Sequence, residues 1–307
     1  MKKILYVFFA FLGLYQMAAG QQEPQYSQYM FNQLALNPAY AGSRGTLSGT
    51  LLFRKQWWGF DGAPVNANIS LHKPSANEQH GFGFNFVHDR LGVVQQNFLE
   101  LSYAYQLELG KAKLSLGLSG GFTNYQNRFS EVTTRDPDQI IPNANLTAWL
   151  PRVGTGAYFR TEKFYVGVST PNLLSGRYFR FNNTLVQDIA DRQRSHLFAM
   201  VGGVIPLNET LDLRPSMVWK YVNNAPMQFD LNTTMFFSKT FGVGVGYRTG
   251  DAVIMMLEYI SPKYFRFGYA FDYSLNPVQS VSAGSHEFMV GMDISWGRSR
   301  FLTPRFF

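Results

Sequence analysis

The chain contains no cysteine among its 307 residues, which excludes a disulfide framework and an amino-terminal lipid anchor on cysteine. Charged residues are also scarce: they make up 15% of the chain, against about 25% in an ordinary globular domain. Beyond the amino terminus, no segment reaches the roughly 18 to 20 unbroken apolar residues of a membrane helix. The apolar residues, 46% of the chain, are therefore spread over many short segments.

The one long apolar run lies at the start of the chain. Lys2 and Lys3 precede an apolar stretch from Ile4 to Tyr15, and small residues follow up to Gly20. This pattern predicts a secretory signal peptide, residues 1–20, cleaved after Gly20; a lone membrane anchor fits less well because the run is short. Removing two lysines lowers the formal charge from +7 to +5 (7 − 2 = 5). With so mild a balance and no basic cluster, we expect no nucleic-acid partner.

After the signal peptide, apolar and polar residues alternate with period two. Residues 264–273, YFRFGYAFDY, place aromatic rings on one face and Arg, Gly, Ala and Asp on the other; residues 112–123 and 227–237 behave in the same way. Strict alternation marks a strand between unlike environments. Several of these segments have the length of a transmembrane β-strand, about 9 to 11 residues, rather than the 5 or 6 typical of soluble strands. We therefore predict an all-β fold, a transmembrane antiparallel outer-membrane β-barrel.

The alternating segments predict about 14 strands within residues 46–307, an even number, as such barrels require. The predicted strands are 46–58, 64–73, 79–89, 95–109, 111–124, 151–161, 162–169, 194–206, 210–222, 226–238, 240–249, 252–261, 262–273 and 284–296. Tight connections fall at one end of this barrel and every long connection at the other. Bacterial barrels have short periplasmic turns and long extracellular loops. The long connections are thus either a surface that holds a partner or simply mobile loops.

No pattern in the sequence points to catalysis or to a metal. The five histidines lie on four segments, with His80 and His88 sharing one, and none of them has metal-binding spacing. The Gly-x-Ser-x-Gly string at residues 117–121 lies inside an alternating strand segment and is therefore no nucleophile elbow. We expect no enzyme activity, no catalytic or metal-binding residue and no cofactor. Charges of both signs are predicted to face the lumen, which favours mutual pairing over a selective pore: Arg54, Glu100, Glu108, Lys113, Asp212, Arg214, Asp230, Glu258, Arg266, Asp272 and Asp293.

Two adjacent tryptophans stand in residues 56–64, QWWGFDGAP. Because neighbouring strand residues point to opposite faces, the alternation predicts that Trp57 lies in the lipid-facing aromatic girdle. It predicts that Trp58 points inward at the mouth of the barrel, beside Phe60 and Asp61. There Trp58 either packs the rim or offers an aromatic anchor to a partner.

Several motifs, in this order, resemble the PorP/SprF family of type IX secretion system membrane proteins of Bacteroidetes. They include QYSQYMFNQLALNPAYAGS at the mature start, FRKQWWGFDGAP, HGFGFNFVHDRLG, VGVSTPNLLSG, LRPSMVWKY, YRTGDAV, SHEFMVG and the closing PRFF. The resemblance covers essentially the whole mature chain. It implies a non-enzymatic outer-membrane barrel that binds a large secreted protein with a C-terminal sorting domain, as gliding adhesins have, and supports its export or surface attachment. It also implies contacts with the periplasmic ring and the peptidoglycan-binding components of the secretion system. The alternative is a passive, porin-like transport barrel for small solutes.

Two segments outside the predicted strands are candidate partner sites. Residues 21–45 precede the first strand and contain Tyr29, Met30, Asn37 and Pro38; we expect either a plug in the barrel or a periplasmic docking face. Proline at position 38 disfavours helix at the residue before it. The closing residues Arg305, Phe306 and Phe307 are expected to be either an assembly signal or a periplasmic contact, because Pro304 does not suit a central strand.

Overall fold

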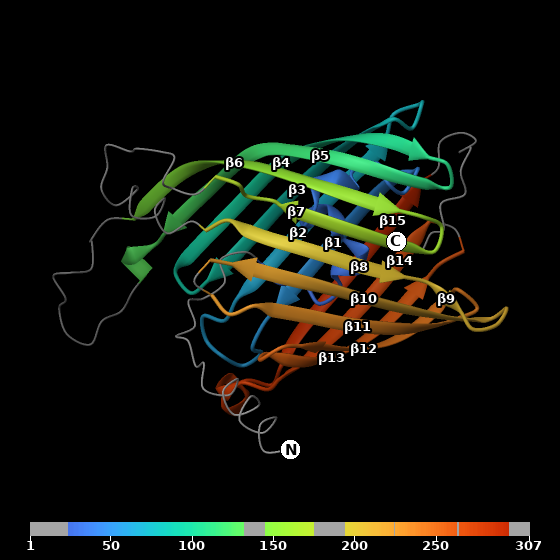
Figure 1. The fold of residues 1–307 in the computed structure, drawn as a ribbon. Coiled ribbons are helices and arrows are strands. Elements are labelled where there is room, and N and C mark those ends of the chain that lie inside the picture. The colour runs from blue at the N-terminus through green and yellow to red at the C-terminus, as the bar shows by residue number, and fades with distance from the viewer. Residues whose placement is uncertain (1–23, 132–144, 175–193, 224, 263, 295–307) are drawn as a thin grey trace, which may run out of the picture.

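The computed structural model describes residues 24–131, 145–174, 194–223, 225–262 and 264–294, which form an antiparallel β-barrel. The strands are β1 Leu47–Lys55, β2 Val65–Pro74, β3 His80–Leu91, β4 Val94–Leu109, β5 Ala112–Asn127, β6 Leu146–Arg160, β7 Phe164–Thr170, β8 His196–Gly203, β9 Ile205–Pro206, β10 Leu211–Val222, β11 Gln228–Phe237, β12 Phe241–Arg248, β13 Ala252–Ile260, β14 Phe265–Ser274 and β15 Ser285–Ile294. Each strand pairs with its neighbours, and β1 pairs with both β2 and β15, which closes the wall (Figure 1).

The predicted fold class is confirmed, and so is the strand number. The two-residue β9 pairs with β10, as β8 does, and both lie within the predicted strand 194–206. The wall is thus a closed barrel of fourteen strands with one short extra piece. None of the helical segments in the described residues is long and apolar enough to cross a membrane.

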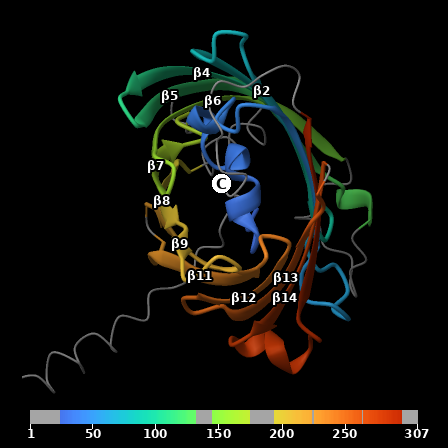
Figure 2. The same ribbon diagram turned by 90° about the vertical axis from the view of Figure 1, so that its right-hand side faces the viewer.

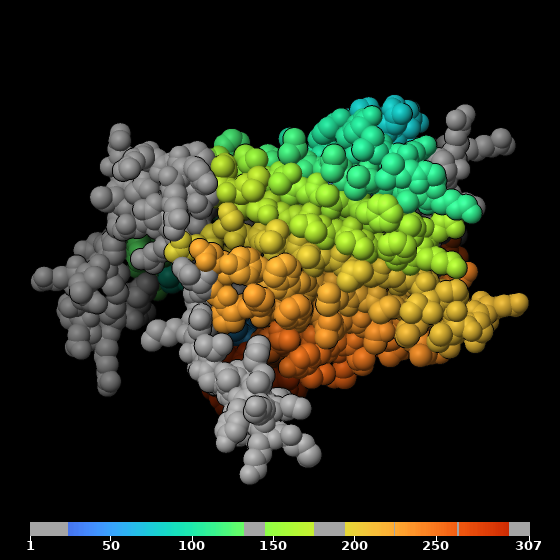
Figure 3. All heavy atoms as spheres, in the orientation of Figure 1, coloured from blue at the N-terminus to red at the C-terminus, as the bar shows by residue number. Residues whose placement is uncertain are grey.

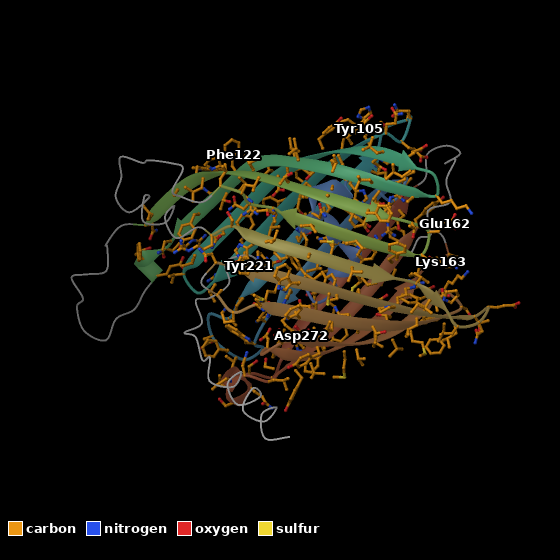
Figure 4. All side chains as sticks on the ribbon, in the orientation of Figure 1. Tyr105, Phe122, Glu162, Lys163, Tyr221 and Asp272 are labelled. Atoms are coloured by element: carbon orange, nitrogen blue, oxygen red, sulfur yellow. The ribbon has the colours of Figure 1, made fainter. Side chains whose placement is uncertain are left out.

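The outer face of the wall is apolar, and its residue types change along the barrel axis from aromatic near the ends to aliphatic in the middle. Aliphatic side chains such as Leu51, Leu101, Leu118, Val245, Met255 and Leu257 are exposed in the middle of their strands. Exposed aromatic side chains gather near both ends: Phe82, Tyr105, Phe164, Phe241, Tyr259 and Phe267 near one, and Phe122, Trp149, Tyr221, Phe229, Tyr247 and Tyr273 near the other. Figure 3 shows the continuous outer surface, and Figure 4 shows Tyr105 and Tyr221 toward opposite ends. An apolar band between aromatic girdles is the surface expected of a strand wall in lipid.

The two ends of the barrel differ in their connections. Residues 75–79, 110–111, 161–163, 207–210, 238–240 and 261–264 are short turns at one end, which we call the short-turn end. The other end carries 56–64, 128–145, 171–195 and 275–284 together with three tight connections, and we call it the long-loop end. This asymmetry agrees with the prediction, although residues 132–144 and 175–193 lie outside the described residues.

Inside the wall lies the chain that precedes β1, residues 24–45, which we call the lumen segment. It is built from three single turns of 3-10 helix, Tyr29–Phe31, Gln33–Ala35 and Pro38–Tyr40. Figure 2, a view along the barrel, shows it enclosed by the strands. Its side chains pack with inward residues such as Leu52, Phe198, Met200 and Val218 to form the hydrophobic core of the protein. The core of this barrel is therefore in its lumen, where an open pore would hold water.

Candidate functional site: the lumen segment and its walls

The lumen segment runs from one mouth of the barrel to the other. Near the long-loop end, the Gln25 side chain donates to Gln228, the first residue of β11, at 3.2 Å. Near the short-turn end, the Gly42 amide donates to His72 Nδ1 at 3.1 Å. There Arg44 also forms an ion pair with Asp293, close to the end of β15, at 3.0 Å. The twenty residues from Gln25 to Arg44 (44 − 25 + 1 = 20) thus traverse the lumen outside any strand and are tied to the wall at both ends.

On one side of the lumen, the segment meets a cluster of buried charges that we call the charged wall. Its members are Arg54, Lys220, Asp230, Arg248, Asp272 and Glu287, from β1, β10, β11, β12, β14 and β15. Three cations face three carboxylates. The ion pairs include Arg54 with Asp272 (2.7 Å) and Glu287 (3.1 Å), Arg248 with Asp230 (3.2 Å) and Asp272 (3.1 Å), and Lys220 with Asp230 (2.7 Å).

The charged wall holds the backbone of the lumen segment directly. The amides of Ser27 and Gln28 each donate to one carboxylate oxygen of Glu287, both at 2.8 Å. The Ser27 hydroxyl lies 2.8 Å from both the Asp272 carboxylate and Arg54 Nη1, donating to the first and accepting from the second. A carboxylate that receives two amides fixes both the position and the direction of the chain.

Tyr29 extends this contact to the neighbouring strands. Its hydroxyl donates to Ser216 Oγ at 3.1 Å, with the Asp230 carbonyl at 3.4 Å. The hydroxyl is buried inside the barrel and ties the segment to β10 as a hydrogen-bond donor.

On the opposite side the segment meets glycines instead of charges, and we call this side the glycine wall. It consists of Gly81 and Gly83 on β3, Gly117 on β5, Gly156 on β6 and Gly167 on β7. A Cβ on Gly117 would overlap the backbone of Ala39, and one on Gly81 would overlap the carbonyl of Ala41. Because only glycine lets two backbones approach so closely, these positions set the distance between segment and wall.

Asn37 and the tyrosines complete the contact on the glycine side. Asn37 caps the turn Pro38–Tyr40 by accepting from the Ala39 amide at 2.9 Å, and it donates to the Ala157 carbonyl at 3.1 Å. The Tyr40 ring packs edge-on to Tyr158 at 5.3 Å between centroids, and Tyr158 stacks on Tyr165 at 5.6 Å. The Tyr158 ring also borders Gly167, 3.0 Å from where a Cβ would lie.

Four predicted partner residues belong to this interior. Tyr29, Asn37 and Pro38 are buried in the lumen, and Met30 is half-buried and packs against the core there. In this arrangement their side chains contact the barrel itself. A partner on either side of the membrane would reach them only if the segment left the lumen.

Trp58 does not point into the lumen, and that prediction is wrong. β1 ends at Lys55, and Trp57 adopts a φ of 47°, in the left-handed region that breaks strand alternation. The chain therefore turns so that the Trp58 ring lies over the Lys55 ammonium at 4.7 Å and edge-on to His286 at 5.3 Å, both on the outward face. Trp58 is 49% exposed, at the outer rim of the barrel.

The rim around Trp58 is an ordered surface. The Trp58 amide donates to the Gly284 carbonyl at 2.7 Å and its carbonyl accepts from Ala283 at 2.8 Å, which joins loops 56–64 and 275–284. The Phe60 ring, 46% exposed, and Asp61, also exposed, lie on the same turn. These three predicted residues thus form one exposed patch, the Trp58 rim. Arg305, Phe306 and Phe307 lie outside the described residues.

The predicted lumen charges are buried or half-buried, with one exception. Glu108 has the predicted parity, that of the buried residues of β4, but it is exposed at the strand end, where it pairs with Lys113 at 3.4 Å. The sequence analysis missed Lys220, Arg248 and Glu287, although the alternation that found Asp230 and Asp272 also points these three inward. In the part of the chain that the structure describes, no three His, Asp or Glu side chains are grouped to hold a metal ion.

A closed fourteen-strand wall with an apolar outer band and a lumen filled by its own chain defines this protein as an outer-membrane β-barrel. Its sequence places it more narrowly: residues 18–292 match the family described as type IX secretion system membrane protein PorP/SprF, and the chain belongs to that family. It is accordingly a membrane component of the type IX secretion system, located in the outer membrane. No curated protein matched the sequence.

Solved structures with a similar fold are outer-membrane proteins of distant sequence. The CymD monoaromatic hydrocarbon channel is 13% identical, with a TM-score of 0.51 over 93% of this chain and 95% of that one. Omp33 of Acinetobacter baumannii (9% identity, TM-score 0.47, 82% and 100% covered) and a Pseudomonas aeruginosa FadL homologue (12%, 0.42, 90% and 95%) are similar at a lower level. At such low identity, the likeness to CymD concerns the fold alone.

Proposed function

We propose that this protein is a non-enzymatic accessory of the type IX secretion system that binds a large secreted protein with a C-terminal sorting domain. Binding takes place at the long-loop end and supports export or surface attachment of that protein. The observation that carries the proposal is the filled lumen: the lumen segment occupies the interior and is tied to the wall at both mouths. A barrel built in this way offers its rims, rather than a passage, to other molecules.

The Trp58 rim is the part of the long-loop end that we assign to cargo contact. Trp58 and Phe60 present aromatic surface beside the carboxylate of Asp61, and the hydrogen bonds to loop 275–284 hold this turn in place. Exposed aromatic side chains on a rigid support are typical anchors of protein interfaces. The mature chain arrives in the outer membrane, in this proposal, after cleavage of the signal peptide at residues 1–20.

At the short-turn end we assign contacts with the periplasmic ring and the peptidoglycan-binding components. Charged side chains of both signs are exposed on the turns there, including Lys111, Glu162, Lys163 and Glu209; Figure 4 shows Glu162 and Lys163 at this end. A mixed polar surface suits a hydrated partner in the periplasm. The closing residues Arg305–Phe307 remain a second candidate for such a contact.

Gene deletion followed by an inventory of surface proteins tests the function. We expect the loss of one large surface protein with unchanged uptake of small solutes. Trp58→Ala should leave barrel assembly intact and reduce display of that protein. Trp149→Ala is the matched control, because Trp149 is another exposed tryptophan near the same end, and display should stay normal. Equal display in both variants would remove cargo contact from the Trp58 rim.

Conductance separates this proposal from passive transport. Purified protein in a planar bilayer should conduct little, because the lumen segment fills the barrel. Deleting residues 25–40 should raise the conductance if the barrel still folds. Steady conductance of the full-length chain, combined with normal secretion in the deletion strain, would favour porin-like transport instead.

A further inference from the structure

The lumen segment has a direction, and the direction places its amino end at an unexpected mouth. The first residue of β1, Leu47, and the last residue of β15, Ile294, pair with each other at the short-turn end. A leader folded under the barrel would keep its amino end on that same side. Yet Gln25 and Ser27 contact residues near the opposite ends of the strands: Gln228 opens β11, and Glu287 is the third residue of β15.

Three further contacts give the same direction. The Tyr26 carbonyl accepts from Arg248, the last residue of β12, at 3.5 Å. Pro24 and Tyr26 border a cavity together with Phe98, near the start of β4, and Pro171, just after β7, both toward the long-loop end. At the other end of the segment, Gly42 contacts Pro74 and Gly81, which flank the short turn 75–79. The chain thus enters at the long-loop mouth and leaves at the short-turn mouth to begin β1.

We propose that the mature amino end of this protein is displayed on the outside of the cell, at the long-loop mouth. Short turns face the periplasm and long loops face outward in bacterial barrels, so Pro24, the first described residue, lies at the outer mouth. The signal peptide directs the chain into the periplasm, and the amino end freed by its cleavage then passes through the lumen as the barrel forms around it. This inference concerns membrane topology and does not depend on the cargo.

In this topology, the amino end outside the cell is covalently continuous with the lumen segment inside the barrel. Tension on the amino end would reach Ser27, held by Glu287 and Asp272, and then, through the segment, Arg44 and Asp293 at the periplasmic mouth. No helix or separate domain is needed to connect the two sides of the outer membrane.

Single cysteines test the topology, because the natural chain has none. The variant is Glu23→Cys, labelled with a membrane-impermeant maleimide on intact cells and again after the outer membrane is permeabilised. Ser280→Cys, exposed in loop 275–284, is the outer control, and Ala76→Cys, exposed in turn 75–79, is the inner control. We expect Glu23→Cys to be labelled on intact cells as fully as Ser280→Cys, and Ala76→Cys only after permeabilisation.

Labelling of Glu23→Cys only after permeabilisation would overturn the proposal. Failure to label Ser280→Cys on intact cells would also overturn it, because the long loops would then face the periplasm. If Glu23→Cys interferes with signal peptide cleavage, Gln25→Cys replaces it; the Gln25 side chain is half-buried at the same mouth. Loss of cargo display with normal labelling would affect the proposed function and leave the topology standing.

Discussion

The charged wall and the glycine wall hold the same segment by different physics. On the charged side, buried ions and hydrogen bonds reach out to the backbone at Ser27 and Gln28. On the glycine side, no ion pair holds the segment; apart from single hydrogen bonds such as that from the Ser169 hydroxyl to the Leu36 carbonyl (2.7 Å), the strand backbones at Gly81 and Gly117 lie directly against it. Buried ion pairs add little net stability because of their desolvation cost, and their main effect is to select one arrangement. The charged wall thus fixes the position of the lumen segment along the barrel axis. The glycine wall fixes the distance between the segment backbone and the strands.

The largest effect is expected from filling the glycine wall. In Gly81→Ala combined with Gly117→Ala, each new methyl group meets backbone atoms that cannot rotate away. Overpacking usually costs about 1–3 kcal/mol per site, and we expect at least the upper end here, with loss of the fully folded form. The readout is the mobility shift between unheated and heated samples in detergent gels. Gly120→Ala is the matched control on β5, with no atom within 4 Å of the added Cβ; equal behaviour of the two would contradict the role of the glycine wall.

Breaking the charged wall comes next. Arg248→Met leaves Asp230 and Asp272 buried with fewer cationic partners. Removing one partner of a buried pair costs about 3–5 kcal/mol, measured as the free energy of unfolding in urea with lipid vesicles. The control is Arg128→Met, whose pair with Glu131 is 40% and 43% exposed and for which we expect about 0–1 kcal/mol. A small loss for Arg248→Met would mean that water enters the charged wall.

A smaller effect is expected where the segment is tied by one polar side chain. Asn37→Ala removes the cap on the Ala39 amide and the bond to the Ala157 carbonyl. We expect a loss of about 1–2 kcal/mol in the same unfolding measurement. Asn77→Ala, in the exposed turn 75–79 with local hydrogen bonds only, should cost clearly less. Equal losses would show that the lumen contact of Asn37 adds nothing to its cap.

The smallest effect is expected from removing the hydroxyl of Tyr158, whose ring packs against Tyr40 at the glycine wall. The Tyr158 hydroxyl is buried and makes no hydrogen bond within the described residues. Tyr158→Phe should therefore change the free energy of unfolding by about zero or raise it slightly. Tyr158→Ala, which also removes the ring contacts with Tyr40 and Tyr165, should cost about 3–5 kcal/mol. A large loss in Tyr158→Phe would show that the hydroxyl, and not the ring, matters.

Much of the barrel was predictable because its signal is local. Period-two alternation yielded the strand number and most inward charges, since each strand meets lipid and lumen on its own. Trp58 was misplaced because the left-handed conformation of one residue, Trp57, reverses the alternation after it. The inward direction of Arg248 could be predicted because it shares its parity with Gly246. Its ion pairs with Asp230 and Asp272 could not, because no local pattern indicates them.

The path of the lumen segment was not predictable from these patterns. Residues 24–45 show no strand or long-helix periodicity, and their contacts are remote: Ser27 and Glu287 are 260 positions apart. A plug and a docking face were both consistent with the sequence, because the two differ only in tertiary contacts. The glycines of the wall were likewise visible in the sequence, whereas the backbone that approaches them was not.

The remote pairing of Ser27 with Glu287 also bears on the timing of assembly. Contacts between the two ends of a chain form late, because long loops must close first. β15 carries Glu287 and Asp293 and is the strand that completes the wall against β1. The pairing of β15 with β1 thus closes the barrel and also fixes the lumen segment inside it. A chain without β15 could do neither. Assembly therefore has no intermediate in which the barrel is closed and its lumen is empty.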